Sequence, residues 1–246
     1  MSRRPRILIT LDSGSTDRRG IALETVVTKS AYGEQVARAG GIPLYVATTD
    51  DVNLVSAMAS VMDGLVVTGG YFDIPPQAYG ASANGRRLDA VKSDRTRFEN
   101  DLLNTAMQRR CPILAVCGGM QLLNVVLGGT LLIDIGADRP GALDHEQPTS
   151  PATPGHPLKL VPHTAWTADL DTDAAWAANS THHQALDVVA PELTVWAHAP
   201  DGIIEAVGAR HDPAVVGVQW HPELLDDPLC RRLYGQLVAE ARRRMV

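Results

Sequence analysis

The sharpest local feature of the sequence is residues 113–121, which read Ile113-Leu114-Ala115-Val116-Cys117-Gly118-Gly119-Met120-Gln121. Its four apolar residues predict a buried strand that ends at Cys117. The glycines that follow lack side chains and therefore allow a tight turn directly into a helix. This geometry would expose the Cys117 sulfur at a helix N-terminus, where the dipole and free amides favour a thiolate. The Gly118 amide would face an oxyanion on an attacked carbonyl. Taken alone, the stretch also fits a buried, unreactive cysteine.

Strand-like and helix-like segments alternate on the N-terminal side of this elbow. Apolar runs at 7–11, 43–47 and 65–68 predict strands, and segments at 29–38, 51–62 and 93–110 predict helices. The elbow adds a strand at 112–116 and a helix at 119–127. On the helix at 93–110 we expect Arg95 and Glu99 to form an exposed pair. Such alternation is typical of parallel strands joined by crossover helices, so we predict an α/β fold with a mostly parallel central sheet and helices on both faces.

The second half of the chain is richer in short strands. We expect them at 130–135, 158–161, 193–199, 203–209 and 215–220, followed by a final helix at 228–244. These are the additional short strands of the predicted architecture. The chain has 246 residues, and its motifs come from both halves, so we expect a single domain spanning 1–246.

Composition excludes several classes of protein. The chain carries 22 Lys+Arg and 28 Asp+Glu, a net charge of −6, which argues against nucleic-acid binding. No apolar run approaches the roughly 20 residues of a membrane span, and we expect no secretory signal at the N-terminus. Three cysteines do not make a disulfide framework, so we expect a reducing, cytoplasmic location. Cys111 and Cys230 are expected to be packing residues.

A candidate base for the cysteine lies about a hundred residues away, in Val218-Gln219-Trp220-His221-Pro222-Glu223. A thiol nucleophile needs a base, and that base needs a partner to fix its tautomer. His221 and Glu223 supply both at the carboxyl end of a predicted strand. Open α/β sheets bind their ligands at this edge. We therefore expect Cys117, His221 and Glu223 to meet there.

Two further motifs carry groups suited to chemistry. Thr68-Gly69-Gly70 ends a predicted strand and offers a second source of backbone donors for an oxyanion, although it also fits a plain glycine turn. The long loop after Gly70 is expected to line the pocket. The segment Asn179-Ser180-Thr181-His182-His183-Gln184 contains adjacent histidines, which could be metal ligands, substrate contacts or loop residues.

These four features together resemble the class I glutamine amidotransferase superfamily, and within it the γ-glutamyl-γ-aminobutyrate hydrolase-like branch, the peptidase C26 group. The resemblance covers nearly the whole chain in order. Besides the elbow, it is carried by the residues at 6–12, Gly69 to Pro76 with Tyr79-Gly80, Met120 to Val125 with Gly128-Gly129-Thr130, Asn179-Ser180 with His182 to Ala185, Asp201 to Ala206, and Gly217 to Glu223.

The resemblance implies a flavodoxin-like fold and a Cys-His-Glu triad, with Cys117 as nucleophile, His221 as base and then acid, and Glu223 orienting it. It implies hydrolysis of a γ-glutamyl amide through a thioester, on a small-molecule substrate, with no metal and no organic cofactor required. A homodimer is compatible with the sequence. The further residues that the resemblance implies are the oxyanion amides of Gly70 and Gly118 and substrate contacts from Gly69, Gln121, Ser180, Thr181, His182 and His183.

One departure from the family concerns the residue directly after the nucleophile. Many relatives carry Arg or Tyr there, whereas this chain has Gly118. The missing side chain opens the pocket wall, so it bears on substrate identity more than on the reaction.

Three alternatives remain open at this point. The chain could be a glutaminase component that delivers ammonia to a separate synthase. It could be a metal-dependent hydrolase that uses His182, His183, His221 and Glu223 as ligands. It could also be a binding module that keeps the fold without the chemistry.

Overall fold

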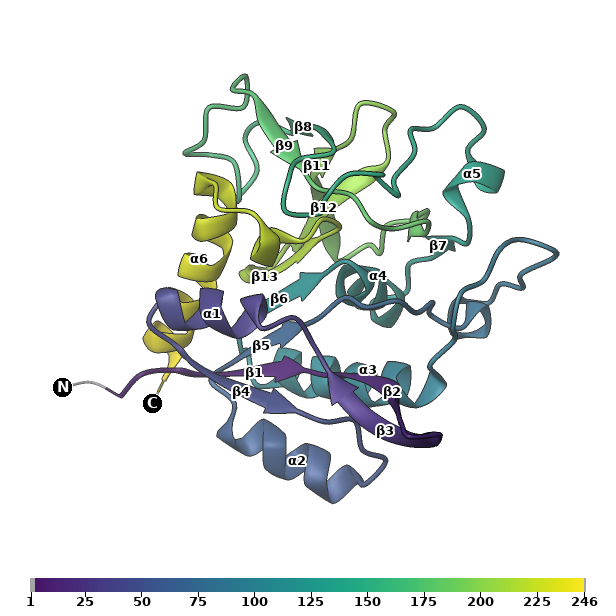
Figure 1. Cartoon of the computed structure of the whole chain (residues 1–246). Coiled ribbons are helices and arrows are strands. Elements are labelled where there is room, and N and C mark those ends of the chain that lie inside the picture. Colours follow the sequence, from purple (N-terminus) through teal and green to yellow (C-terminus); the bar gives the residue numbers. More distant parts are fainter. Residues whose placement is uncertain (1–2, 246) are drawn as a thin grey trace.

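The computed structural model describes residues 3–245 and arranges nine strands into one sheet of order β4-β1-β5-β6-β13-β12-β11-β8-β9 (Figure 1). The first five strands of this order run parallel, and the other four pair antiparallel. The sheet therefore draws strands from both halves of the chain. The parallel strands are β4 (Ile42–Val46), β1 (Arg6–Thr10), β5 (Gly64–Val67), β6 (Ile113–Val116) and β13 (Asp212–Val218); the antiparallel ones are β12 (Ile204–Ala209), β11 (Leu193–His198), β8 (His156–Leu160) and β9 (Trp176–Ala178).

Helices cover both faces of this sheet, which confirms the predicted α/β class. Ile7 and Ile9 of β1 belong to the core beneath α1 (Ala31–Arg38) and α6 (Pro228–Arg244). Leu8, between them, belongs to the core beneath α2 (Val52–Val61), α3 (Ser93–Gln108) and α4 (Gly118–Val126). Parallel strands buried on both faces appear as unbroken apolar runs, and β1, β5 and β6 could be predicted because they are buried in this way. Among residues 3–245, no helix combines the length and apolar character that crossing a membrane requires.

The segment at 130–135 is not the single strand that we expected. Only β7 (Leu131–Leu132) is extended, paired with β10 (Ala185–Leu186), and the short helix α5 (Ile135–Asp138) follows. The carboxylate of Asp138 accepts hydrogen bonds from the amides of Ile133 at 2.9 Å and Asp134 at 3.2 Å. These bonds turn the chain out of the strand direction. Two 3-10 turns complete the fold, η1 (Pro76–Tyr79) and η2 (Pro222–Leu224).

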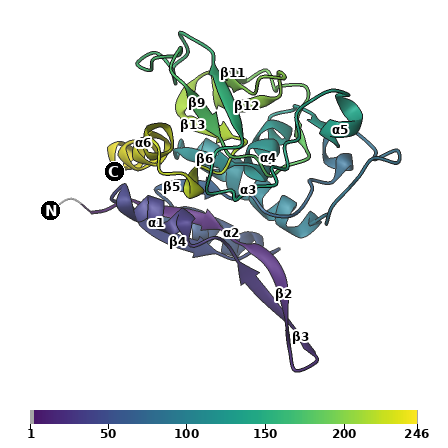
Figure 2. The ribbon, with the colours of Figure 1, turned by 45° about the horizontal axis from the view of Figure 1, so that its top comes forward.

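A hairpin that the sequence analysis missed follows β1. Strands β2 (Asp12–Arg18) and β3 (Ile21–Val27) pair antiparallel and project away from the rest of the molecule (Figure 2). Arg19 and Gly20 form the turn with φ of 59° and 79°, the left-handed conformation that suits a two-residue hairpin turn. Most of β3 is exposed on both faces, including Ile21 and Val26.

Arg95 and Glu99 do not form the exposed pair that we expected. Their exposed fractions are 2% and 0%. The face of α3 that carries Arg95 packs beneath the loop after β5, where the guanidinium donates to the carbonyl oxygen of Thr68 at 2.7 Å. The guanidinium also pairs with Glu99 at 2.9 Å and with Asp12 at 3.0 Å. The pair is therefore a buried support for the loop that contains Gly69 and Gly70.

Candidate active site

The predicted elbow is present between β6 and α4. Strand β6 ends at Val116, Cys117 occupies the turn, and α4 begins at Gly118. Cys117 has φ 53° and ψ −112°, a backbone conformation that costs a non-glycine residue about 1–3 kcal/mol. The surrounding structure holds it, because the Cys117 amide donates to Val218 of β13 at 2.8 Å and its carbonyl accepts from Gln121 at 3.1 Å. Such a strained turn presents a nucleophile at the edge of a sheet.

His221 and Glu223 lie at the carboxyl end of β13, next to Cys117. His221 Nδ1 is 2.8 Å from Glu223 Oε1, and both side chains are buried. Asn179 fixes the backbone of His221 from two sides: its Oδ1 accepts from the His221 amide at 2.7 Å, and its Nδ2 donates to the His221 carbonyl at 3.1 Å. The structure thus brings together the three residues that the sequence analysis singled out.

Lys29 also reaches this group, and the sequence analysis missed it. Its Nζ lies 3.2 Å from Glu223 Oε1 and 3.0 Å from His221 Nδ1. Lys29 precedes α1 and is nearly two hundred residues away in the chain, and no local pattern connects it to the elbow. Burial of Glu223 raises its pKa, but the charges of His221 and Lys29 outweigh burial and hold the carboxyl pKa below its usual value.

Electrostatics favour a thiolate on Cys117 paired with a protonated His221. Burial raises the pKa of the Cys117 thiol, but the charge of His221 and the hydrogen bond with it outweigh burial and lower the pKa to about 7. Burial lowers the pKa of His221, while the charges of Glu223 and Cys117 raise it to about 9. The two groups titrate as a coupled pair, so between these limits the thiolate–imidazolium form predominates.

These pKa values predict a bell-shaped dependence of kcat/KM on pH, with limbs near 7 and 9. With Cys117 as the predicted nucleophile and His221 as the predicted acid, the lower limb reports loss of the thiol proton and the upper limb loss of the imidazolium proton. Alkylation by iodoacetamide isolates the lower limb, and we expect its rate to rise with a midpoint near 7. Cys117→Ala serves as the labelling control. A midpoint near the usual thiol pKa of 9.0 would contradict the ion pair.

The glycines after β5 lie against Cys117. A Cβ atom on Gly69 would sit 2.8 Å from the Cys117 Cβ and 3.0 Å from His221 Cε1, so only glycine fits there. The Gly69 amide donates to Tyr32 Oη at 3.2 Å and is already engaged. Gly70 and Gly118 line the same pocket as Cys117, and the N–H of Gly118 begins α4, where helix amides lack intrahelical partners.

A pocket of about 210 Å³ opens onto Cys117. Part of the long loop after Gly70 lines it, as expected. Of the predicted substrate contacts, Gln121, Thr181, His182 and His183 reach the pocket, whereas the buried Ser180 lies behind its wall and donates to the His145 carbonyl at 2.9 Å. Their roles in binding stay predictions. The lining comprises Gly70, Tyr71, Phe72, Asp73, Asp89, Cys117, Gly118, Gln121, Glu146, Gln147, Thr181, His182, His183 and Gln184.

Comparison with known proteins assigns this arrangement to a family. The model of the Peptidase C26 family matches residues 8–223, which include the elbow, the glycine loop and the His221–Glu223 end of β13. The chain belongs to the Peptidase C26 family. It is therefore a glutamine amidotransferase-like hydrolase.

Relatives of this Peptidase C26 member span most of its length. Protein NtpR of Enterococcus hirae is 38% identical over 204 residues, covering 82% of this chain and 83% of the relative. A gamma-glutamyl-gamma-aminobutyrate hydrolase of Escherichia coli is 34% identical over 211 residues, covering 83% and 81%. A solved glutamine amidotransferase of Thermotoga maritima has a TM-score of 0.56 at 13% identity, covering 90% of this chain and 77% of that one. That likeness shows the fold.

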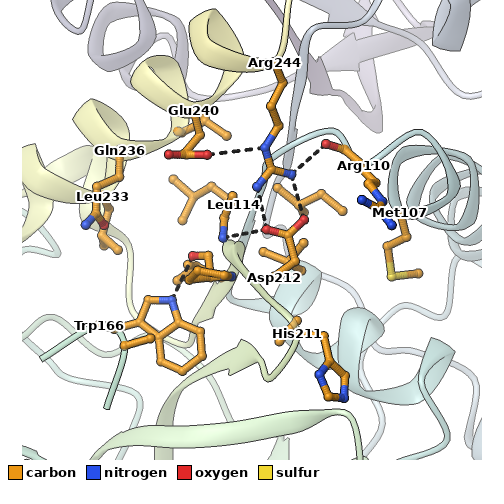
Figure 3. Close-up of a pocket in the computed structure, with 18 of the residues that line it drawn as sticks. Met107, Arg110, Leu114, Trp166, His211, Asp212, Leu233, Gln236, Glu240 and Arg244 are labelled. Atoms are coloured by element: carbon orange, nitrogen blue, oxygen red, sulfur yellow. Dashed lines mark hydrogen bonds and ion pairs between the residues drawn. The ribbon is translucent and has the colours of Figure 1, made fainter. Parts of the chain in front are cut away.

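A larger hollow of about 1130 Å³ lies elsewhere on this Peptidase C26 fold (Figure 3). It is lined by the first residues of β6 and β13 and by the C-terminal half of α6, so it lies at the amino ends of the parallel strands. Arg244 dominates it, pairing with Asp212 at 2.6 Å and donating to the Arg110 carbonyl at 2.7 Å. Because ligands of open α/β sheets bind at the carboxyl ends, the smaller pocket at Cys117 is the candidate site.

Proposed function

We propose that this protein hydrolyses the γ-glutamyl amide bond of a small γ-glutamyl amine, releasing glutamate and the free amine. The observation that carries the proposal is the positive φ of Cys117 at the end of β6, next to the hydrogen-bonded pair of His221 and Glu223. A nucleophile on a strained turn, a base beside it and a carboxylate that orients the base form the arrangement required for acyl transfer. The name of the Escherichia coli relative, a gamma-glutamyl-gamma-aminobutyrate hydrolase, supports the γ-glutamyl substrate class.

The first half of the reaction acylates the cysteine. The Cys117 thiolate attacks the γ-carbonyl carbon, and the carbonyl oxygen takes the negative charge. The amides of Gly70 and Gly118, which line the pocket beside the sulfur, donate to that oxyanion. When the tetrahedral intermediate collapses, the C–N bond breaks and the amine leaves with the proton of His221. A γ-glutamyl thioester on Cys117 remains.

The second half of the reaction regenerates the thiolate. His221, now neutral, removes a proton from a water molecule, which attacks the thioester carbon. The C–S bond breaks, glutamate leaves, and His221 retains the proton for the next cycle. Glu223 keeps Nδ1 of His221 as the donor, so that Nε2 faces the reacting atoms throughout.

The charges around the pocket suit an amino-acid head group. Asp73, Asp89 and Glu146 line it, and Arg87 bridges Asp89 and Glu146 at 3.0 and 3.1 Å. The γ-glutamyl group carries an ammonium and a carboxylate on its α-carbon. Carboxylates accept hydrogen bonds from an ammonium, and neighbouring amides and cations receive the carboxylate. The carboxylates of Asp73, Asp89 and Glu146 line the pocket and could receive the ammonium.

Glutamate release from a panel of γ-glutamyl compounds tests the proposal. The panel contains γ-glutamyl derivatives of γ-aminobutyrate, putrescine and ethanolamine, together with glutamine, and Cys117→Ala gives the blank. We expect at least one γ-glutamyl amine to be cleaved faster than glutamine without any added protein. Absence of Cys117-dependent glutamate from every compound would overturn the proposal. Hydrolysis of glutamine alone, stimulated by a synthase, would replace it with the glutaminase alternative.

A further inference from the structure

A second cluster of reactive side chains lies buried behind the wall of the active-site pocket. At its centre is Glu205 of β12, whose side chain is fully buried. Glu205 Oε1 lies 3.4 Å from His156 Nε2, 3.6 Å from His145 Nδ1 and 3.7 Å from His182 Nε2. The ligand atoms of His145, His156 and Glu205 all lie within 4.8 Å of one another.

The outer nitrogen of each imidazole is already committed as a donor. His156 Nδ1 is 3.0 Å from the Pro157 carbonyl, His182 Nδ1 is 2.9 Å from the Gln184 carbonyl, and His145 Nε2 is 3.0 Å from Asp201 Oδ2. Carbonyl and carboxylate oxygens only accept, so these three nitrogens carry the protons. In the neutral imidazoles, the remaining nitrogens therefore direct lone pairs towards Glu205.

The inner atoms of the cluster have no donor to satisfy them. Within residues 3–245, both carboxylate oxygens of Glu205, His156 Nε2 and His182 Nε2 make no hydrogen bond. The Ser180 hydroxyl lies 3.1 Å from His145 Nδ1 but donates its proton to the His145 carbonyl. A buried carboxylate surrounded by lone pairs is costly, because burial removes water and the neighbours repel it. A cation placed between them would attract both the carboxylate and the lone pairs of the imidazoles.

We propose that this protein binds a divalent transition-metal ion, Zn²⁺ by its donor set, through His145, His156 and Glu205, with His182 as the fourth ligand. Zinc–ligand bonds of 2.0–2.1 Å place tetrahedral ligands about 3.3–3.4 Å apart, close to the 3.4–3.7 Å between Glu205 Oε1 and the three imidazole nitrogens. His182 lies outside the group of three residues whose ligand atoms are within 4.8 Å of one another, so its ring would turn towards the ion on binding. Three imidazoles and a carboxylate are ligands that zinc accepts. Metal-binding histidines characteristically donate their outer N–H to a carbonyl or carboxylate, as all three do here.

The site would hold together segments that are distant in the chain. His156 begins β8, Glu205 lies in β12, and His145 and His182 come from the loops at 139–155 and 179–184. His182 also lines the pocket at Cys117, so the ion would fix one wall of that pocket. Four protein ligands close a coordination sphere, which is the pattern of structural zinc sites. Of the metal ligands considered from the sequence, this set shares only His182.

Metal content tests the proposal without relying on activity. Protein expressed without a histidine tag is equilibrated with Zn²⁺ and passed through gel filtration. Its zinc content is then measured by inductively coupled plasma mass spectrometry. We expect about one zinc per chain in the wild type. Glu205→Gln and His156→Gln should each retain no more than about a tenth of the wild-type zinc. His211→Gln, which removes an exposed histidine outside the cluster, should retain the wild-type amount.

A spectroscopic probe keeps the test decisive if the ligand variants fold poorly. Co²⁺ added to the metal-free wild type should give the visible absorption of tetrahedral cobalt, and one equivalent should saturate it. Asp201→Asn, which removes the carboxylate that accepts from the outer His145 N–H and from the amides of Leu143 and Ile203, should weaken Co²⁺ binding by about 10–100-fold. Two results would overturn the proposal: wild-type protein that retains less than about a tenth of an equivalent, or folded Glu205→Gln that retains as much zinc as the wild type. Neither result bears on the Cys117-dependent hydrolysis.

Discussion

Replacing Cys117 with alanine is expected to slow glutamate release by about 10⁴- to 10⁶-fold, the range found when a nucleophile is removed from a triad. The variant keeps the pocket and the oxyanion amides but has no atom that can form the thioester. Alanine and cysteine both carry a Cβ atom, so the φ of 53° at position 117 costs them a similar amount of free energy. We therefore expect the turn to be retained. Steady-state glutamate release, measured with the best substrate of the panel, gives the ratio of kcat/KM.

The other two cysteines provide matched controls for this variant. Burial raises the pKa of Cys111 and of Cys230, so neither thiol ionises near neutral pH. Cys111→Ala and Cys230→Ala should therefore keep kcat/KM within about threefold of the wild type, with thermal unfolding used to confirm that each variant is folded. A Cys117→Ala enzyme that retains a tenth of wild-type activity would exclude the thioester mechanism.

The parts of this molecule that could be predicted from sequence are those whose pattern is local. The run Ile113 to Val116 is buried on both faces, and the glycines after Cys117 allow α4 to start against β5: a Cβ on Gly119 would lie 2.3 Å from the Val67 carbonyl oxygen. Both requirements appear within nine consecutive residues. The final helix, at 228–244, coincides with α6 because Asp227 caps it and Pro228 fits its first turn.

Other features depend on contacts between distant segments and left no local pattern. The hairpin β2–β3 has no buried face, so its strands lack the apolar alternation by which strands are recognised. Lys29 meets Glu223 only because α1 and η2 pack together in the folded chain. Likewise, His145 and His156 are unremarkable in sequence until β12 brings Glu205 between them. Contacts between segments that are distant in the chain cannot be predicted from the local alternation of apolar and polar residues.

The i,i+4 spacing correctly predicts that Arg95 and Glu99 form an ion pair, but not that the pair is buried. Replacing Arg95 is therefore expected to have a large effect on stability. The i,i+4 pair with Glu99 exists, but both partners are buried. Replacing Arg95 with methionine would leave the Glu99 carboxylate buried without its cation. We expect a loss of about 3–5 kcal/mol in the free energy of unfolding, the usual cost of breaking a buried pair from one side. Urea denaturation measures it.

A double variant separates the charge of Arg95 from its role as a support. In Arg95→Met/Glu99→Leu the charges of both residues are gone, and Asp12 keeps its ion pair with Lys92 at 2.6 Å. An apolar pair of similar volume should therefore restore most of the lost free energy of unfolding. Arg95 also donates to the carbonyls of Thr68 and Gly69, at 2.7 and 3.3 Å, and the double variant cannot replace these bonds. Its glutamate release should therefore remain slow although its stability has recovered, because the loop that positions the Gly70 amide has lost the hydrogen bonds from Arg95.

Two results would contradict this account. If the free energy of unfolding of Arg95→Met lies within about 1 kcal/mol of the wild-type value, the buried pair does not stabilise the fold as its burial implies. If the double variant regains both stability and activity, the guanidinium acts only by neutralising Glu99.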